Sequence, residues 1–147
     1  MKFVNALKLA SAAALLLLGT SAQAQSSSYT PGTVWTFTNV QIEPGQFESY
    51  MDFLDREYKK SNDFGMKEGY VVSYHVFQVN NARAGEPDLI LAVEAKDYVS
   101  NAQQLEMQKR YEAFMAKDNR KMTAESGERK VMRKFLGTME LQELKLK

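Results

Sequence analysis

The sequence predicts a single α+β domain in which two helices cover one face of a four-stranded antiparallel sheet. Three observations lead to this prediction. The chain has 147 residues, which suits one domain rather than two. Four segments alternate or run apolar as strands do, and two others carry apolar residues at helical spacing. The chain has no cysteine, so its stability must come from a hydrophobic core, alone or together with a partner subunit, rather than from disulfides.

The beginning of the chain has the layout of a secretory signal peptide. Lys2 and Lys8 precede an apolar run that is shorter than the roughly 20 residues a membrane span needs. Small residues follow at Ala22 and Ala24. We therefore expect residues 1–24 to be cut off after Ala24, which makes the mature protein periplasmic or secreted, with no stable membrane insertion.

The charge balance of the mature chain is close to neutral. Removal of the two signal-peptide lysines takes the basic residues from 19 to 17 against 18 acidic ones, so the net charge changes from +1 to −1. Nucleic-acid binding needs a clear excess of basic residues. The composition therefore predicts no nucleic-acid partner.

A serine-rich lead-in and the first strand come next. Residues 25–33 are polar and contain a Pro-Gly pair, so we expect a flexible segment ahead of a domain that spans 34–147. Val34–Ile42 alternates and is rich in β-branched and aromatic residues, as strands are. One of its faces carries Trp35, Phe37, Asn39 and Gln41.

An amphipathic helix is predicted over Pro44–Asn62. Pro44 suits the first helical position, and Gly65 and Gly69 are the predicted stop signals. The apolar residues recur at helical spacing, which predicts that this helix packs onto the sheet. They are Phe47, Tyr50, Met51, Leu54 and Tyr58.

The middle of the chain predicts an antiparallel hairpin. Tyr70–Asn80 is apolar on both faces, which is typical of a strand buried on both sides. The loop composition of Asn80–Pro87 separates it from a third strand, Asp88–Asp97. Given the length of this loop, we expect His75 to lie opposite Ala92. A slip of one residue would turn His75 toward the helices.

The last third of the chain predicts a second helix and a fourth strand. Ser100 is a good N-cap for a helix over Asn101–Asp118. Residues 119–134 are highly charged and predict a loop or a short extra helix. Phe135–Leu146 reads as the final strand. The helix takes its apolar positions from Ala102, Leu105, Met107, Tyr111, Phe114 and Met115, and one face of the strand carries Phe135, Met139 and Leu141.

The resulting order, β-α-β-β-α-β, is the ferredoxin-like arrangement. A strand that leads through Glu43-Pro44-Gly45 into an amphipathic helix, followed by a hairpin, a helix and a strand, resembles the dimeric α/β-barrel superfamily. That superfamily includes antibiotic-biosynthesis-monooxygenase-like and NIPSNAP-like proteins. The resemblance covers Val34–Leu146 and implies that two copies pair through their sheets to form a barrel. It also implies that ligands lie inside the barrel or between sheet and helices.

The residues favour a homodimer independently of the resemblance. Helices on one side leave the other sheet face bare, and on that face Trp35 and Phe37 accompany polar groups. Exposed aromatic surface of this size indicates a partner or a ligand. A second copy of the chain is the simplest partner, because isologous pairing needs only one patch.

A candidate ligand site follows from the same face. Its predicted members are Trp35, Phe37, Asn39, His75 and Glu94. His75 and Asn39 are the candidate catalytic residues, although a lone strand histidine more often makes a satisfied hydrogen bond. One histidine and no cysteine exclude a multi-histidine or Cys/His metal centre. The sequence predicts no metal and no cofactor.

The resemblance adds a comparison for three of these residues. Monooxygenase-like relatives use an Asn, a Trp and a His together, sometimes without a cofactor, and Asn39, Trp35 and His75 match these types. The haem-degrading members place their His and Trp on or near the second helix, where this chain has neither. The resemblance therefore does not extend to haem oxygenation.

The charged segment before the last strand predicts a solvated surface. Its basic residues are preceded by Glu125 and Glu128, and such mixed runs normally face water. The basic residues are Arg129, Lys130, Arg133 and Lys134.

Three functions stay open on the sequence. The first is an exported dimer that binds a small, partly apolar molecule. The second is a cofactor-independent enzyme of monooxygenase or isomerase type. The third is a purely structural or interaction module, since fold alone does not decide function.

Overall fold

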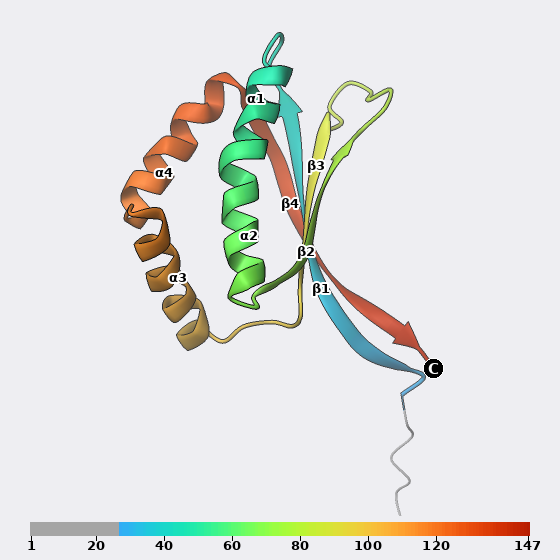
Figure 1. The fold of residues 1–147 in the computed structure, drawn as a ribbon. Helices are drawn as coiled ribbons and strands as arrows, with labels where there is room; N and C mark the ends of the chain where they lie inside the picture. Colours follow the sequence, from blue (N-terminus) through green and yellow to red (C-terminus); the bar gives the residue numbers. More distant parts are fainter. Residues whose placement is uncertain (1–26) are drawn as a thin grey trace, which may run out of the picture.

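A computed structural model describes residues 27–147 and has the α+β class predicted from the sequence (Figure 1). The predicted signal peptide, residues 1–24, lies outside the described residues. In chain order the elements are β1 (Tyr29–Ile42), α1 (Phe47–Phe53), the π-helical turn η1 (Leu54–Tyr58), α2 (Lys59–Lys67), β2 (Val71–Gln78), β3 (Leu89–Ala95), α3 (Asn101–Met115), α4 (Asn119–Glu128), the 3₁₀ turn η2 (Arg129–Val131) and β4 (Arg133–Leu146). Within this part of the chain, no helix has the length and apolar character needed to cross a membrane.

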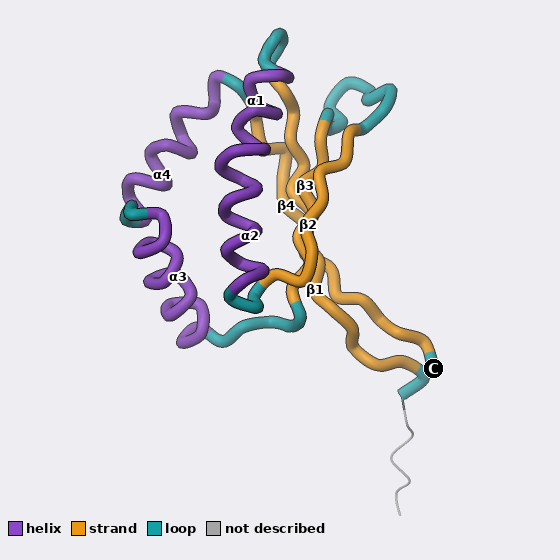
Figure 2. The backbone as a smooth tube through the Cα atoms, in the orientation of Figure 1, coloured by secondary structure: helices purple, strands orange, loops and turns teal. Residues whose placement is uncertain are grey.

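The sheet has four strands in the order β2-β3-β1-β4, and every neighbouring pair is antiparallel. β1 begins at Tyr29 rather than at Val34, so much of the predicted lead-in is strand. These first residues pair with the end of β4, where Tyr29 lies opposite Leu146. The pairing of β1 with β3 starts only at Val34. The two long strands therefore continue as a ribbon beyond the rest of the sheet (Figure 2).

The first helix runs without a break through α1, η1 and α2, from Phe47 to Lys67. The predicted start at Pro44 was wrong, because Pro44 and Gly45 form a turn in which the amide of Gln46 donates to the carbonyl of Glu43 at 3.0 Å. Gly65 does not stop the helix either. It is buried inside α2, where a Cβ would lie 2.7 Å from Cγ2 of Val71.

This helix packs onto the sheet as its apolar stripe predicted. The buried core consists of Val40, Tyr50, Leu54, Leu89 and Leu91. Two members come from the helix and three from the central strands β1 and β3. Phe47, Met51 and Tyr58, half-buried, pack against this cluster. One face of the sheet is therefore covered by α1 and α2.

The second predicted helix forms, but it does not reach the sheet. Ser100 and Gln103 make the capping box that starts α3. No residue of α3 is buried, and Leu105 is 60% exposed. The prediction that this helix covers the sheet and adds to the core was therefore wrong. α3 rests instead on α2, where the rings of Phe64 and Phe114 stack at 4.4 Å. Figure 1 shows α3 and α4 lying outside α2, away from the sheet.

Two expectations for the outer strands were wrong. β2 is an edge strand, and Phe77 is 48% exposed, so apolar residues on both faces did not mean burial on both faces. In β4 a register shift separates Phe135, which pairs with Val40, from Met139, which pairs with Phe37. This bulge puts Phe135 on the helix-covered face, while Met139 and Leu141 lie on the open face.

Candidate functional site

The sheet face opposite the helices brings together the residues predicted as a ligand site. The register confirms that His75 lies opposite Ala92, as expected. Because residues paired across strands share a face, three rows run across it. Read from β4 to β2, the rows are Leu141–Trp35–Glu94–Ser73, Met139–Phe37–Ala92–His75 and Gly137–Asn39–Ile90–Phe77. We call these twelve residues the open face.

Four aromatic rings form a continuous stack on the open face. The Trp35 ring lies 5.9 Å from that of Phe37 and 6.2 Å from that of His75, with stacked planes. His75 stacks in turn on Phe77 at 5.6 Å. Phe77 and Leu141 are each about half exposed. The face therefore presents a broad aromatic surface that no helix of the described residues covers.

The polar members of the open face are not all in contact with one another. Glu94 accepts a hydrogen bond from Ser73 Oγ at 2.6 Å, and this bond lowers the pKa of Glu94. Asn39 lies on β1 and His75 on β2, with β3 between them. Strands are spaced about 4.8 Å apart, so the two candidate catalytic residues are separated by a full strand. Within one chain they do not form an acid–base pair.

The opposite, helix-covered face holds cavities that the sequence did not predict. One of 240 Å³ lies between the sheet and the first helix, with Thr36 and Leu91 among its floor residues and Tyr50 in its wall. A neighbouring cavity of 560 Å³ shares three lining residues with it, so the two adjoin. The shared residues are Phe53, Tyr58 and Arg129.

Two arginines line the smaller cavity, which corrects the prediction of a solvated basic face. Arg133 is only 7% exposed, and its Nη2 donates to the carbonyl and the hydroxyl of Ser126 at 3.3 and 3.1 Å. Its guanidinium lies 3.7 Å from the centre of the Phe135 ring. Arg129, half-buried, lies 4.3 Å from the centre of the Phe53 ring. Each of the two guanidinium groups thus lies against an aromatic ring.

Several buried polar atoms around this cavity have no hydrogen-bond partner among residues 27–147. They include Nε of Arg129, Nε of Arg133 and Oη of Tyr58. Burial raises the pKa of Tyr58 to about 12. Burial also lowers the pKa of Arg129, and the positive charge of Arg133 lowers it further. Two like charges therefore lie near each other, and the charges of Glu125 and Glu57 only partly offset the fall in the Arg129 pKa.

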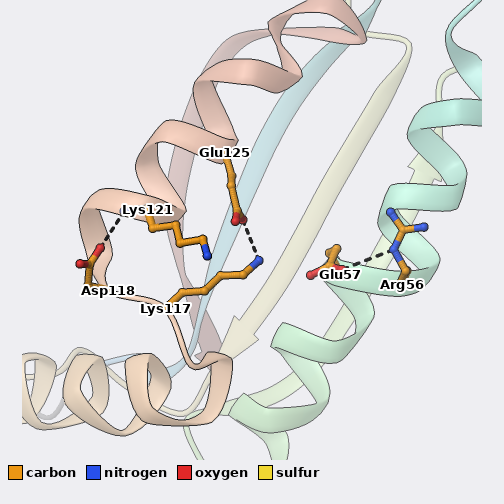
Figure 3. A network of polar contacts seen from close by, with 6 residues as sticks. All are labelled: Arg56, Glu57, Lys117, Asp118, Lys121 and Glu125. Carbon is orange, nitrogen blue, oxygen red and sulfur yellow. Dashed lines mark hydrogen bonds and ion pairs between the residues drawn. The ribbon is translucent and has the colours of Figure 1, made fainter.

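Three carboxylates line the larger cavity, those of Glu57, Glu125 and Glu128, and the first two are paired with other cations. Glu125 of α4 pairs with Lys117 at 2.8 Å, and Glu57 of η1 pairs with Arg56 at 3.4 Å. Figure 3 shows these two pairs on opposite sides of the gap between α4 and the first helix. Across residues 27–147, no carboxylate lies within 4.0 Å of the guanidinium of Arg129 or Arg133.

No group of three or more His, Asp or Glu side chains within the described part of the chain is arranged to hold a metal ion. Comparison with protein-family models, curated proteins and solved structures finds no match. The chemistry of the two faces is therefore the basis for assigning a function.

Proposed function

We propose that the protein is an exported homodimer in which two open faces pack together and enclose a space for a small, partly apolar ligand. Each chain would contribute Trp35, Phe37, Asn39, His75 and Glu94 to that space. The ferredoxin-like arrangement and the dimeric barrel belong to this proposal, and the strand order β2-β3-β1-β4 agrees with them.

The aromatic stack on the open face is the observation that carries the proposal. A surface with Trp35, Phe37, His75 and Phe77 in continuous contact is costly to leave in water. Glu94 is the only acidic residue of the twelve, and none is Lys or Arg. Two copies of this face therefore meet with little like-charge repulsion, which favours self-association.

The ribbon at the end of β1 and β4 is a second argument for a partner chain. Tyr29 pairs with Leu146, and Pro31 with Leu144, so all four share one face of the ribbon. Leu146 is 84% exposed. A two-stranded ribbon is marginally stable alone, and apolar residues on it become useful when another subunit covers them.

The proposal is tested by sedimentation of the purified chain and of two matched variants. Leu141→Glu places a charge in the open face, at a side chain that is 46% exposed in one protomer, so the protomer still folds. Leu105→Glu makes the same change on α3, away from that face. We expect a dimer for the unmodified chain and for Leu105→Glu, and a monomer for Leu141→Glu.

Two results would contradict this assignment. One is a monomer of the unmodified chain at tens of micromolar. The other is a dimer that Leu141→Glu leaves intact, because the interface would then lie elsewhere. If the dimer forms but Trp35 fluorescence never responds to small apolar molecules, the face serves assembly alone.

A further inference from the structure

The two arginines of the helix-covered face, Arg129 and Arg133, have no carboxylate within 4.0 Å among residues 27–147. A buried charge without a counter-charge costs several kcal/mol, and proteins normally pair such groups. Arg133 is at least nine-tenths buried, yet the groups it contacts are the oxygens of Ser126 and the Tyr50 hydroxyl, which are neutral. Arg129 sits beside it with the same sign of charge.

Contacts with aromatic rings do not remove this cost. Arg133 lies over Phe135 and Arg129 over Phe53, and such cation–π contacts contribute roughly 0.5–2 kcal/mol each. They do not supply acceptors for the two Nε–H groups, which stay unpartnered. The Tyr58 hydroxyl is a third unpartnered donor on the same cavity.

An anion that enters the cavity would supply the missing partner. Arginine's planar fork binds carboxylates through two parallel hydrogen bonds, and a tyrosine hydroxyl adds a third donor. Glu57 and Glu125 line the adjoining cavity of 560 Å³, and both are paired with other cations. Glu128 lines the same cavity. These acids repel an incoming anion, but the two paired ones carry little net charge.

The rest of the cavity defines the body of the ligand. Its walls include Phe53, Leu91, Val93 and Phe135, so a flat apolar group is well accommodated. The volume of 240 Å³ suits a single aromatic ring, and the adjoining cavity of 560 Å³ leaves room for substituents beyond it. An inorganic anion would leave the apolar walls unused.

We propose that this cavity binds a small aromatic carboxylate, with the carboxylate held between Arg129 and Arg133, the Tyr58 hydroxyl as a further donor, and the ring against Phe53 and Leu91. The site lies on the sheet face opposite the proposed dimer interface. It therefore stands or fails separately from the pairing of two chains.

Titration calorimetry of the purified chain with three probes tests this site. Benzoate carries the charge and the ring, benzamide has nearly the same shape without the charge, and inorganic phosphate has charge without a ring. We expect benzoate to bind and to raise the melting temperature. Benzamide and inorganic phosphate should bind about tenfold more weakly or not at all, because each lacks one of the two recognised features.

Three variants locate the binding. Arg129→Gln removes one guanidinium, and Tyr58→Phe removes only the unpartnered hydroxyl. Lys130→Gln makes the same charge change at the exposed neighbouring residue and is the control. Arg129→Gln should weaken benzoate binding about tenfold or more, Tyr58→Phe should weaken it several-fold, and Lys130→Gln should leave it unchanged. Neither cavity variant should lower the melting temperature without ligand, because each removes an uncompensated polar group.

The proposal is overturned if benzoate does not bind at millimolar concentration, or if benzamide binds as tightly as benzoate. It is also overturned if Arg129→Gln and Lys130→Gln have the same effect on benzoate binding. Phosphate that binds as tightly as benzoate would refute the aromatic carboxylate and identify a site for simple anions.

Discussion

Replacement of two helical glycines by alanine tests how tightly the first helix packs on the sheet. Gly127 lies in α4, and a Cβ built on it meets no atom within 4 Å. Gly65 lies in α2, and its Cβ would be 2.7 Å from Cγ2 of Val71. Both substitutions gain the same helix propensity, about 1 kcal/mol, because alanine is less flexible in the unfolded chain. Only the second one also forces a steric overlap.

The two substitutions should have different effects on the free energy of unfolding. Gly127→Ala should raise the free energy of unfolding by about 0.5–1 kcal/mol. Overpacking costs roughly 1–3 kcal/mol, and Val71 is β-branched and cannot easily turn away. Gly65→Ala should therefore leave the stability unchanged or lower it by up to about 2 kcal/mol. Urea unfolding followed by circular dichroism measures both values.

A double substitution identifies the contact that is responsible. Val71→Ala removes Cγ2, so Gly65→Ala in that background should become stabilising, as it is at Gly127. If Gly65→Ala stabilises the otherwise unmodified chain as much as Gly127→Ala does, the close approach of α2 to β2 is refuted.

Two further predictions concern the buried tyrosines and the start of α3. The folded chain keeps the Tyr58 proton up to a pH of about 12 and holds the pKa of Tyr50 above its usual value, whereas the unfolded chain loses these protons near 10. These groups should therefore leave the free energy of unfolding unchanged below about pH 10 and lower it as the pH rises from there toward 12. In urea titrations, Tyr58→Phe should make this fall shallower. Ser100→Ala removes the side-chain acceptor for the Gln103 amide and should destabilise α3 by about 1 kcal/mol. Because α3 buries no residue, we expect faster amide exchange in α3 with little change in the global melting temperature. A cooperative loss of the whole fold would contradict this expectation.

Local patterns in the sequence were enough to predict the fold class and one key register. Alternation and continuous apolar runs located all four strands, and the loop length placed His75 opposite Ala92. Helical spacing correctly placed Tyr50 and Leu54 in the core. These features depend on residues close in the chain, or on a face that is buried within one protomer, and such signals are present in a single sequence.

The errors have non-local causes. Glycine often marks the end of a helix, but Gly65 instead allows α2 to approach Val71 of the next strand closely. The bulge in β4 reverses the facing of Phe135, which simple alternation cannot anticipate. α3 contacts α2 instead of the sheet, so none of its apolar residues is fully buried.

The candidate sites divide in the same way. The open face followed from alternation in β1 and from the hairpin register. The arginine cavity did not, because Arg129 and Arg133 stand in a run of charges that resembles a solvated surface. Their burial depends on Phe53, from the first helix, and on Phe135, whose facing the bulge decides. The fold places each of these two basic residues near an aromatic ring, and this arrangement can be recognised only in the three-dimensional structure.

The environment of Trp35 tests the central claim, that a second copy covers the open face. Trp35 is the only tryptophan, and its ring lies between those of Phe37 and His75 in the aromatic stack, so its fluorescence reports on this face alone. Acrylamide quenching should fall and the emission should shift to shorter wavelength as the protein concentration rises from nanomolar to tens of micromolar. Leu141→Glu should abolish both changes, whereas Leu105→Glu should retain them. Quenching that stays the same over this whole concentration range, in a chain that sediments as a monomer, would contradict the claim.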